Sequence, residues 1–105
     1  MTTGFSIVLT TAPSEAAATA IADCLLERKL AACVQTLPIK SAYVWKDAIA
    51  RDDELLLLIK AKTSDWAAIE AAIKSVHDYE IPEIARIEMA DASKAYLAWI
   101  EAATS

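Results

Sequence analysis

The spacing of hydrophobic residues changes several times along the chain, and each change marks a predicted element. Residues 5–11 are rich in β-branched side chains and predict a first strand. The strand ends before Pro13, because the residue that precedes a proline is disfavoured in the helical region. Ser14 is a candidate N-cap, and the hydrophobic residues after it recur at helical spacing until Arg28. The pattern therefore predicts a strand followed by a helix.

Two long strands are predicted next. Residues 33–45 alternate bulky and polar side chains, and Pro38 within them indicates an edge strand or a bulge. Residues 46–48 predict a tight reversal, although they lack the glycine that a two-residue hairpin prefers. Residues 49–62 predict the return strand, and its aliphatic run at 55–59 is typical of a strand buried on both faces.

The remaining third of the chain predicts two more helices around one more strand. Residues 63–65 are expected to cap a helix that carries a core stripe over 66–76. A polar junction at 77–83 leads into a strand at 84–89. Asp91 is expected to cap the last helix, whose inner face holds Tyr96, Leu97 and Ile100.

This order predicts an α+β fold, the ferredoxin-like split βαβ sandwich (βαββαβ plus a C-terminal helix), as a single domain over residues 1–105. Right-handed crossovers place both main helices on one face of a four-stranded antiparallel sheet. The hairpin at 33–62 has strands of about 13 residues, which extend about 43 Å and project beyond the body. A projecting apolar hairpin predicts self-association, unless a bulge at Pro38 or a loop at 47–53 shortens it.

Composition supports self-association and excludes several classes of partner. Hydrophobic residues make up 56% of the chain, although many are alanine, and Gly4 is the single glycine. A net charge of −5 and a pI near 4.7 argue against nucleic-acid binding. No signal peptide and no run of about 20 apolar residues is seen, so we expect a cytoplasmic protein that does not enter a membrane. Cys24 and Cys33 are expected to be free, buried thiols.

Few residue patterns indicate chemistry. One glycine excludes glycine-rich phosphate loops. His77 with Cys24 or Cys33 is a conceivable nucleophile pair, but no orienting group is identifiable, so we expect no enzyme. His77, the single histidine, is close in sequence to Asp78 and Glu83. Imidazole with carboxylates suits a first-row divalent metal. The alternative interpretation of His77 is a structural or surface residue.

Five short motifs and the opening segment, taken together, resemble one family over essentially the whole chain. They are Leu30-Ala31-Ala32-Cys33-Val34, Ser41-x-Tyr43-x-Trp45, Glu54 with Ile59-Lys60, His77-x-Tyr79-x-x-Pro82-Glu83-Ile84, Tyr96-Leu97-x-Trp99-Ile100, and the opening Leu9-Thr10-Thr11-Ala12-Pro13. The family is that of the CutA divalent-ion tolerance proteins.

The resemblance implies a tight homotrimer built through the long hairpins, similar to the nitrogen-regulatory trimers. It implies a cytoplasmic, heat-robust protein of copper and divalent-cation tolerance, without catalytic activity. The clefts between subunits would be lined by His77, Tyr79, Pro82, Glu83, Lys60, Tyr43 and Trp45. The sequence pattern around Trp99 indicates a packing role, and we also include this residue in the predicted intersubunit cleft.

Two positions depart from bacterial members of the family. Some of those members have a cysteine where this chain has Thr10 and a second histidine where it has Val76, and these residues look like copper ligands in them. Only His77 remains here, so the predicted metal set is His77, Asp78 and Glu83, binding Cu²⁺ weakly.

Three functional hypotheses follow. The first is a non-enzymatic trimer that binds divalent cations weakly at intersubunit clefts. The second is a signalling module that binds a small anionic metabolite or nucleotide in the same clefts through Lys60. The third is a structural trimer that acts through a partner protein.

Overall fold

The computed structural model describes residues 2–105, which form four strands, three α-helices and one 3₁₀ turn. Their bounds are β1 Phe5–Ala12, α1 Glu15–Glu27, β2 Cys33–Trp45, β3 Ala48–Lys62, η1 Thr63–Asp65, α2 Trp66–Val76, β4 Ile84–Glu88 and α3 Lys94–Ala103. This order agrees with the order predicted from the sequence.

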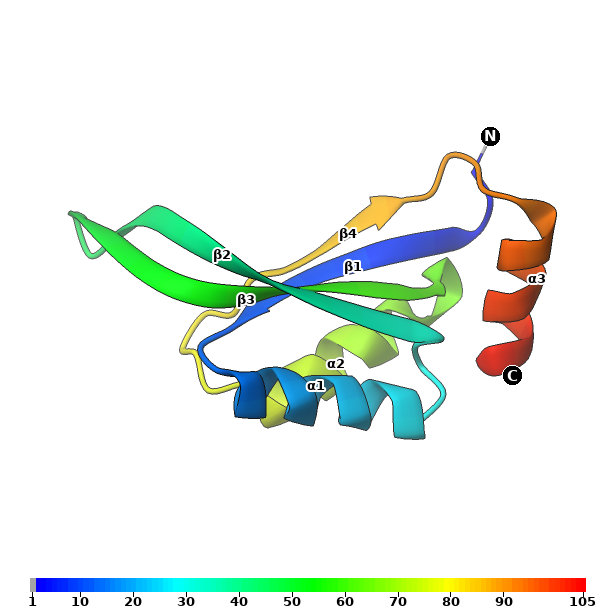
Figure 1. Ribbon diagram of the computed structural model, residues 1–105, viewed down its shortest axis with the longest axis horizontal. Coiled ribbons are helices and arrows are strands. Elements are labelled where there is room, and N and C mark those ends of the chain that lie inside the picture. Colours follow the sequence, from blue (N-terminus) through cyan, green and yellow to red (C-terminus); the bar gives the residue numbers. More distant parts are fainter. Residues whose placement is uncertain (1) are drawn as a thin grey trace.

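The strands form one antiparallel sheet in the order β2-β3-β1-β4. Figure 1 shows α1 and α2 side by side on one face of the sheet, as right-handed crossovers require. The ferredoxin-like α+β fold is therefore confirmed. β2 is an edge strand, with no neighbouring strand on its outer side. Pro38, which has no backbone N–H to donate, is tolerated there.

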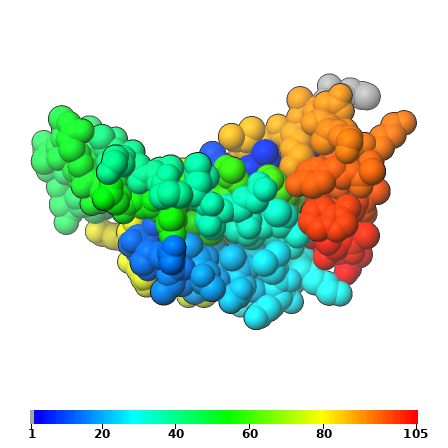
Figure 2. Space-filling model, viewed as in Figure 1, coloured from blue at the N-terminus to red at the C-terminus, as the bar shows by residue number. Residues whose placement is uncertain are grey.

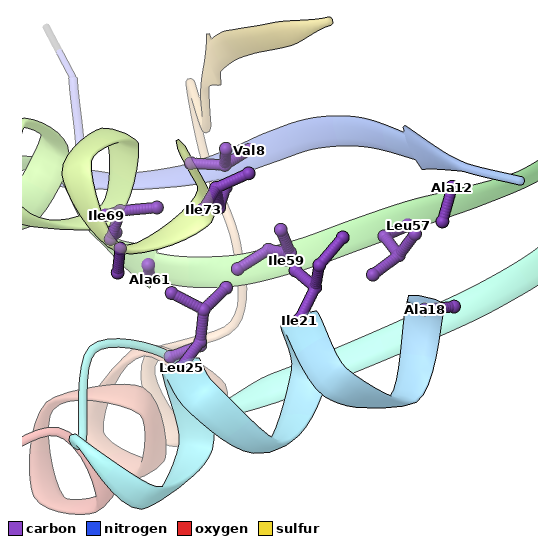
Figure 3. Close-up of a cluster of buried hydrophobic side chains, with 12 residues drawn as sticks. Val8, Ala12, Ala18, Ile21, Leu25, Leu57, Ile59, Ala61, Ile69 and Ile73 are labelled. Carbon is purple, nitrogen blue, oxygen red and sulfur yellow. The ribbon is translucent and has the colours of Figure 1, made fainter. Parts of the chain in front are cut away.

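The core lies between the sheet and these two helices. Alternate residues of β1 and β3, such as Val8 and Ile59, point toward Ile21 of α1 and Ile73 of α2 (Figure 3). Each of these side chains is at most 1% exposed. Burial of one such side chain contributes about 1.5–3 kcal/mol, so this layer fixes the sheet on the helices.

One buried polar group in this core has no partner. Thr10 lies on β1 opposite Leu57 of β3 and Ile84 of β4. Its side chain is fully buried, and no protein group within residues 2–105 forms a hydrogen bond with its Oγ1. An unpaired buried hydroxyl carries an unfavourable free energy of desolvation.

The opposite face of the sheet is apolar and is not covered by α1 or α2. Its residues come from all four strands: Phe5, Ile7 and Leu9 of β1, Leu56 and Leu58 of β3, Leu37 of β2, and Ile87 of β4. Leu37 is 41% exposed and Ile87 is 53% exposed. We call this surface the open sheet face.

The β2–β3 hairpin extends well beyond the rest of the sheet. β1 pairs with β3 only as far as Leu55, whereas β2 continues to pair with β3 up to Trp45 and Ala48. The molecule accordingly measures 44 × 28 × 23 Å, and its hairpin tip protrudes at the end opposite α3 (Figure 2). The predicted long hairpin is confirmed, and neither a bulge at Pro38 nor a loop at 47–53 shortens it.

The hairpin turns without glycine. Lys46 and Asp47 are its two central residues, with φ of 49° and 65°. Positive φ at both positions is the geometry of the two-residue turn that matches strand twist. Positive φ is unfavourable for residues other than glycine, asparagine and aspartate. Lys46 therefore carries most of the strain in this turn.

The helix caps confirm one prediction and correct two others. Ser14 caps α1, since its Oγ accepts the amide of Ala17 at 3.2 Å. Ser93, and not Asp91, caps α3 in the same way, accepting the amide of Tyr96 at 3.2 Å. Residues 63–65 form the 3₁₀ turn η1, and α2 begins without a side-chain cap.

The two cysteines correct a further expectation. Cys24 and Cys33 are free thiols as predicted. Both are half-buried, because Cys24 flanks the core stripe of α1 and Cys33 begins an edge strand.

A polar cluster ties the start of β1 to η1 and β4. Ser6 Oγ and Thr63 Oγ1 donate to the carboxylate of Glu88 at 2.9 and 2.8 Å, and Arg86 donates to the same oxygen at 2.8 Å. The Thr63 hydrogen bond, with those from Ser6 and Arg86, holds the pKa of Glu88 below its ordinary value. The cluster therefore closes the edge of the sheet with satisfied polar groups.

Candidate functional site

A cleft of about 730 Å³ lies at the base of the projecting hairpin. It forms because β1 stops pairing at Leu55, so the distal half of the hairpin has no neighbouring strand. The junction between α2 and β4, residues 77–83, runs past this end of the sheet (Figure 1), and its residues 79–83 line the other side of the cleft. Its lining residues are Thr11, Lys40, Ser41, Ala42, Tyr43, Trp45, Glu54, Tyr79, Glu80, Ile81, Pro82 and Glu83.

Two tyrosines of this cleft are held by carboxylates of the hairpin. Tyr79 donates its hydroxyl to Glu54 Oε2 at 2.7 Å, and Tyr43 donates its hydroxyl to Asp52. Burial and the hydrogen bond to Glu54 raise the pKa of Tyr79 well above its ordinary value, and the hydrogen bond to Asp52 raises that of Tyr43. Both tyrosines therefore stay protonated and act as donors.

The charge of the cleft is negative. Glu54, Glu80 and Glu83 contribute carboxylates, against one lining cation, Lys40. Lys40 already pairs with Asp53 at 3.1 Å on the exposed surface. The cleft as a whole thus favours cations over anions.

His77 lies beside the cleft, not in its lining. Its Nδ1 accepts the amide of Tyr79 at 3.1 Å, so the neutral ring carries its proton on Nε2, which donates to the carbonyl of Thr11 at 2.7 Å. The ring thereby joins the end of β1 to the junction, with its centroid 4.8 Å from that of Tyr79. Both ring nitrogens are engaged, which agrees with the structural interpretation of this residue.

The structure brings together most of the predicted cleft residues. Tyr43, Trp45, Tyr79, Pro82 and Glu83 line the cleft within one chain. Asp78 is exposed next to it.

Besides His77, two other predicted cleft residues do not line the cleft of a single chain. Lys60 Nζ donates to Gln35 at 2.6 Å on the hairpin stem, and Trp99 stacks on Tyr96 of α3 with ring centroids 5.8 Å apart. A role for these two at a subunit boundary remains a prediction.

Asp52, Lys40 and Glu80 were not predicted as site residues from the sequence, and Glu54 was named only within a family motif. The hairpin turn supplies the missing signal. With Trp45 opposite Ala48, Tyr43 lies opposite Ala50, which places Asp52 diagonally across on the same face. The same register puts Glu54 on that face, within reach of Tyr79.

Within residues 2–105, no group of three or more histidine, cysteine, aspartate or glutamate side chains converges in a way that would hold a metal ion. None of the helices described there is long and apolar enough to cross a bilayer.

Comparison with known proteins places the whole arrangement in one family. The model of the CutA1 divalent ion tolerance protein family matches residues 6–103. The divalent-cation tolerance protein CutA of Thermus thermophilus is 40% identical over 95 residues, which cover 90% of this chain and 92% of that protein. Human protein CutA is 37% identical over 100 residues, which cover 94% of this chain and 56% of the human protein.

Solved structures agree with the sequence comparisons. The periplasmic divalent cation tolerance protein CutA from Archaeoglobus fulgidus superposes with a TM-score of 0.94 at 35% identity, covering 96% of this chain and 99% of that one. Sequence and fold thus lead to the same assignment. The chain belongs to the CutA1 family of divalent ion tolerance proteins.

Proposed function

We propose that this chain acts in divalent-cation tolerance as a non-enzymatic homotrimer that binds cations such as Cu²⁺ weakly at its hairpin clefts. The observation that carries the proposal is the negative charge of the cleft, where Glu54, Glu80 and Glu83 face a single paired lysine. The names of its relatives agree with a role in tolerance and mention no reaction. The free thiols suit the reducing cytoplasm that we propose as its compartment.

Weak binding follows from the geometry of the donors. One or two carboxylates with water hold a divalent cation loosely, whereas tight sites use three or more protein ligands. We propose that Glu83 and Asp78 supply carboxylates. His77 would add its imidazole only after giving up one of its two hydrogen bonds.

Calorimetric titration of the full chain with Cu²⁺ tests this proposal. We expect Glu83→Gln and Asp78→Asn to weaken binding, and Asp91→Asn, an exposed acidic residue outside the cleft, to leave it unchanged. His77→Ala is titrated after its melting temperature has been measured, because the ring also joins two segments. If all four variants bind Cu²⁺ with the wild-type affinity, the proposed ligand set is wrong.

The trimer rests on the open sheet face and the projecting hairpin. An apolar face of this extent, with side chains such as Leu37 and Ile87 about half exposed, is typical of a surface that is buried by association. Sedimentation equilibrium is expected to give three times the chain mass of 11.3 kDa. Leu37→Asp should lower that mass, whereas Thr36→Asp, its neighbour on the other side of β2, should not. A wild-type mass of one chain would refute the trimer.

The anionic-ligand alternative finds no support in the cleft of one chain. Lys60, its proposed anchor, is bonded to Gln35, and the lining carries net negative charge. We therefore do not propose a nucleotide or an anionic metabolite as the ligand.

A further inference from the structure

The cleft combines carboxylates with aromatic rings, and this combination points to a ligand other than a bare metal ion. Tyr43, Trp45 and Tyr79 contribute aromatic surface, and Pro82 adds an apolar edge. The acidic side chains come from separate segments, Glu54 from β3 and Glu80 and Glu83 from the junction. A volume of about 730 Å³ is that of a small-molecule site.

The carboxylates of the cleft can accept hydrogen bonds, but they do not surround a single ion. The described acidic residues do not converge in threes, as an all-protein metal site requires. Each carboxylate that takes a tyrosine hydroxyl keeps most of its acceptor positions free. Separate acceptors with apolar surface between them fit a ligand whose positive charges are also separate and joined by hydrocarbon.

The aromatic surface already attracts an ammonium group. Lys46 Nζ lies over the ring of Trp45, 5.7 Å from its centroid. This is a cation–π contact, and tryptophan is the strongest partner for it. Lys46 does not line the cleft, so the contact shows that the Trp45 ring accepts an ammonium group on one of its faces.

We propose that the cleft binds a linear aliphatic diamine or polyamine. Its ammonium groups would pair with Glu54 and with Glu80 or Glu83, while its methylene chain lies along Tyr79 and Trp45. The ligand is an organic cation, so this inference goes beyond the proposed metal binding and does not depend on it.

The test is calorimetric titration of the full chain at low ionic strength with 1,4-diaminobutane and with spermidine. We expect saturable binding with a Kd of about 1 mM or tighter. The uncharged analogue 1,4-butanediol should give no saturable heat. If neither amine binds, or if the diol binds as well as the diamine, the proposal is wrong.

Variants separate the cleft from general attraction to an acidic protein. Glu54→Gln and Trp45→Leu should each raise the Kd about threefold or more, the effect of losing one ion pair or one cation–π contact. Asp23→Asn removes the same charge as Glu54→Gln from an exposed position on α1 and should leave the Kd unchanged. Equal weakening by Asp23→Asn would overturn the assignment to the cleft.

The amine and the metal are then distinguished by one variant. Trp45→Leu removes an aromatic ring and no metal ligand, so it should weaken 1,4-diaminobutane and leave the Cu²⁺ titration unchanged. A loss of Cu²⁺ binding alone would contradict the proposed function, and an unaltered diamine affinity would contradict the proposal made here.

Discussion

Replacement of Thr10 by valine removes the one buried side-chain hydroxyl that lacks a hydrogen-bond partner within residues 2–105. Such a hydroxyl costs about 1–3 kcal/mol when it is desolvated without compensation. Valine has nearly the same shape, and its β-branching suits a position between Leu57 and Ile84 on the sheet. We therefore expect Thr10→Val to raise the free energy of unfolding by about 1–2 kcal/mol.

The assay is equilibrium unfolding in guanidinium chloride at one fixed protein concentration, since association makes stability depend on concentration. With a slope of about 3 kcal/mol per molar, the midpoint should rise by about 0.3–0.7 M and the slope should stay constant. A changed slope would indicate an altered denatured state or a broken two-state transition instead of a removed penalty.

Thr104→Val is the matched control. Thr104 is also buried, at 6% exposure, but its hydroxyl donates to the carbonyl of Ile100 at 2.7 Å. Loss of that hydrogen bond should lower the unfolding free energy by about 1 kcal/mol. The two substitutions are thus expected to have opposite signs. A lower midpoint for Thr10→Val would refute the reasoning, because it would mean that the hydroxyl of Thr10 is hydrogen-bonded in solution.

Three further predictions concern pH and the hairpin turn. The Thr63 hydrogen bond lowers the pKa of Glu88, so the ionised carboxylate stabilises the folded state above the ordinary glutamate pKa. This contribution is lost as pH falls through the lowered pKa. The melting temperature should therefore fall less between pH 7 and pH 3 in Glu88→Gln than in wild type. The raised pKa of Tyr79 stabilises the folded state below the ordinary tyrosine pKa, and this contribution is lost as pH rises through the folded value. In ultraviolet titration Tyr79→Phe should lose the last tyrosine to ionise, whereas Glu54→Gln should make that ionisation easier. Asp47→Gly, at φ of 65°, should change stability by less than about 0.5 kcal/mol in thermal unfolding, because aspartate already tolerates this conformation; a gain of 2 kcal/mol would contradict that view.

The element order could be predicted because hydrophobic spacing differs between strands and helices, and this sequence keeps each spacing over whole elements. The local ends were harder to predict. Asp91 and Ser93 are both good N-caps by residue type, so the local sequence does not choose between them, and in the structure the helix begins after Ser93. The turn at Lys46 was located correctly, but its positive φ follows from the twist of two long paired strands, which residue preference does not predict.

The cleft was predictable only in part, for a related reason. Tyr43, Trp45 and Tyr79 stand out as aromatic residues in polar surroundings. Their carboxylate partners do not, since Asp52 is one of several acidic residues on the hairpin, and only the register of the hairpin selects it. Neither can the sequence alone show which of two hairpin lysines, 40 or 60, faces the cleft, because both lie on strands that twist past it.

The central position of β1 has a consequence for how the chain folds as it is synthesised. β1 is made first, but its partners on both sides, β3 and β4, are made much later. The β2–β3 hairpin, by contrast, has partners that are adjacent in sequence, and it can close as soon as its turn is formed. We therefore expect the hairpin to form ahead of the sheet that holds it. During that interval an apolar two-stranded ribbon is exposed. The nearest molecules with which it can associate are other nascent chains on the same messenger RNA.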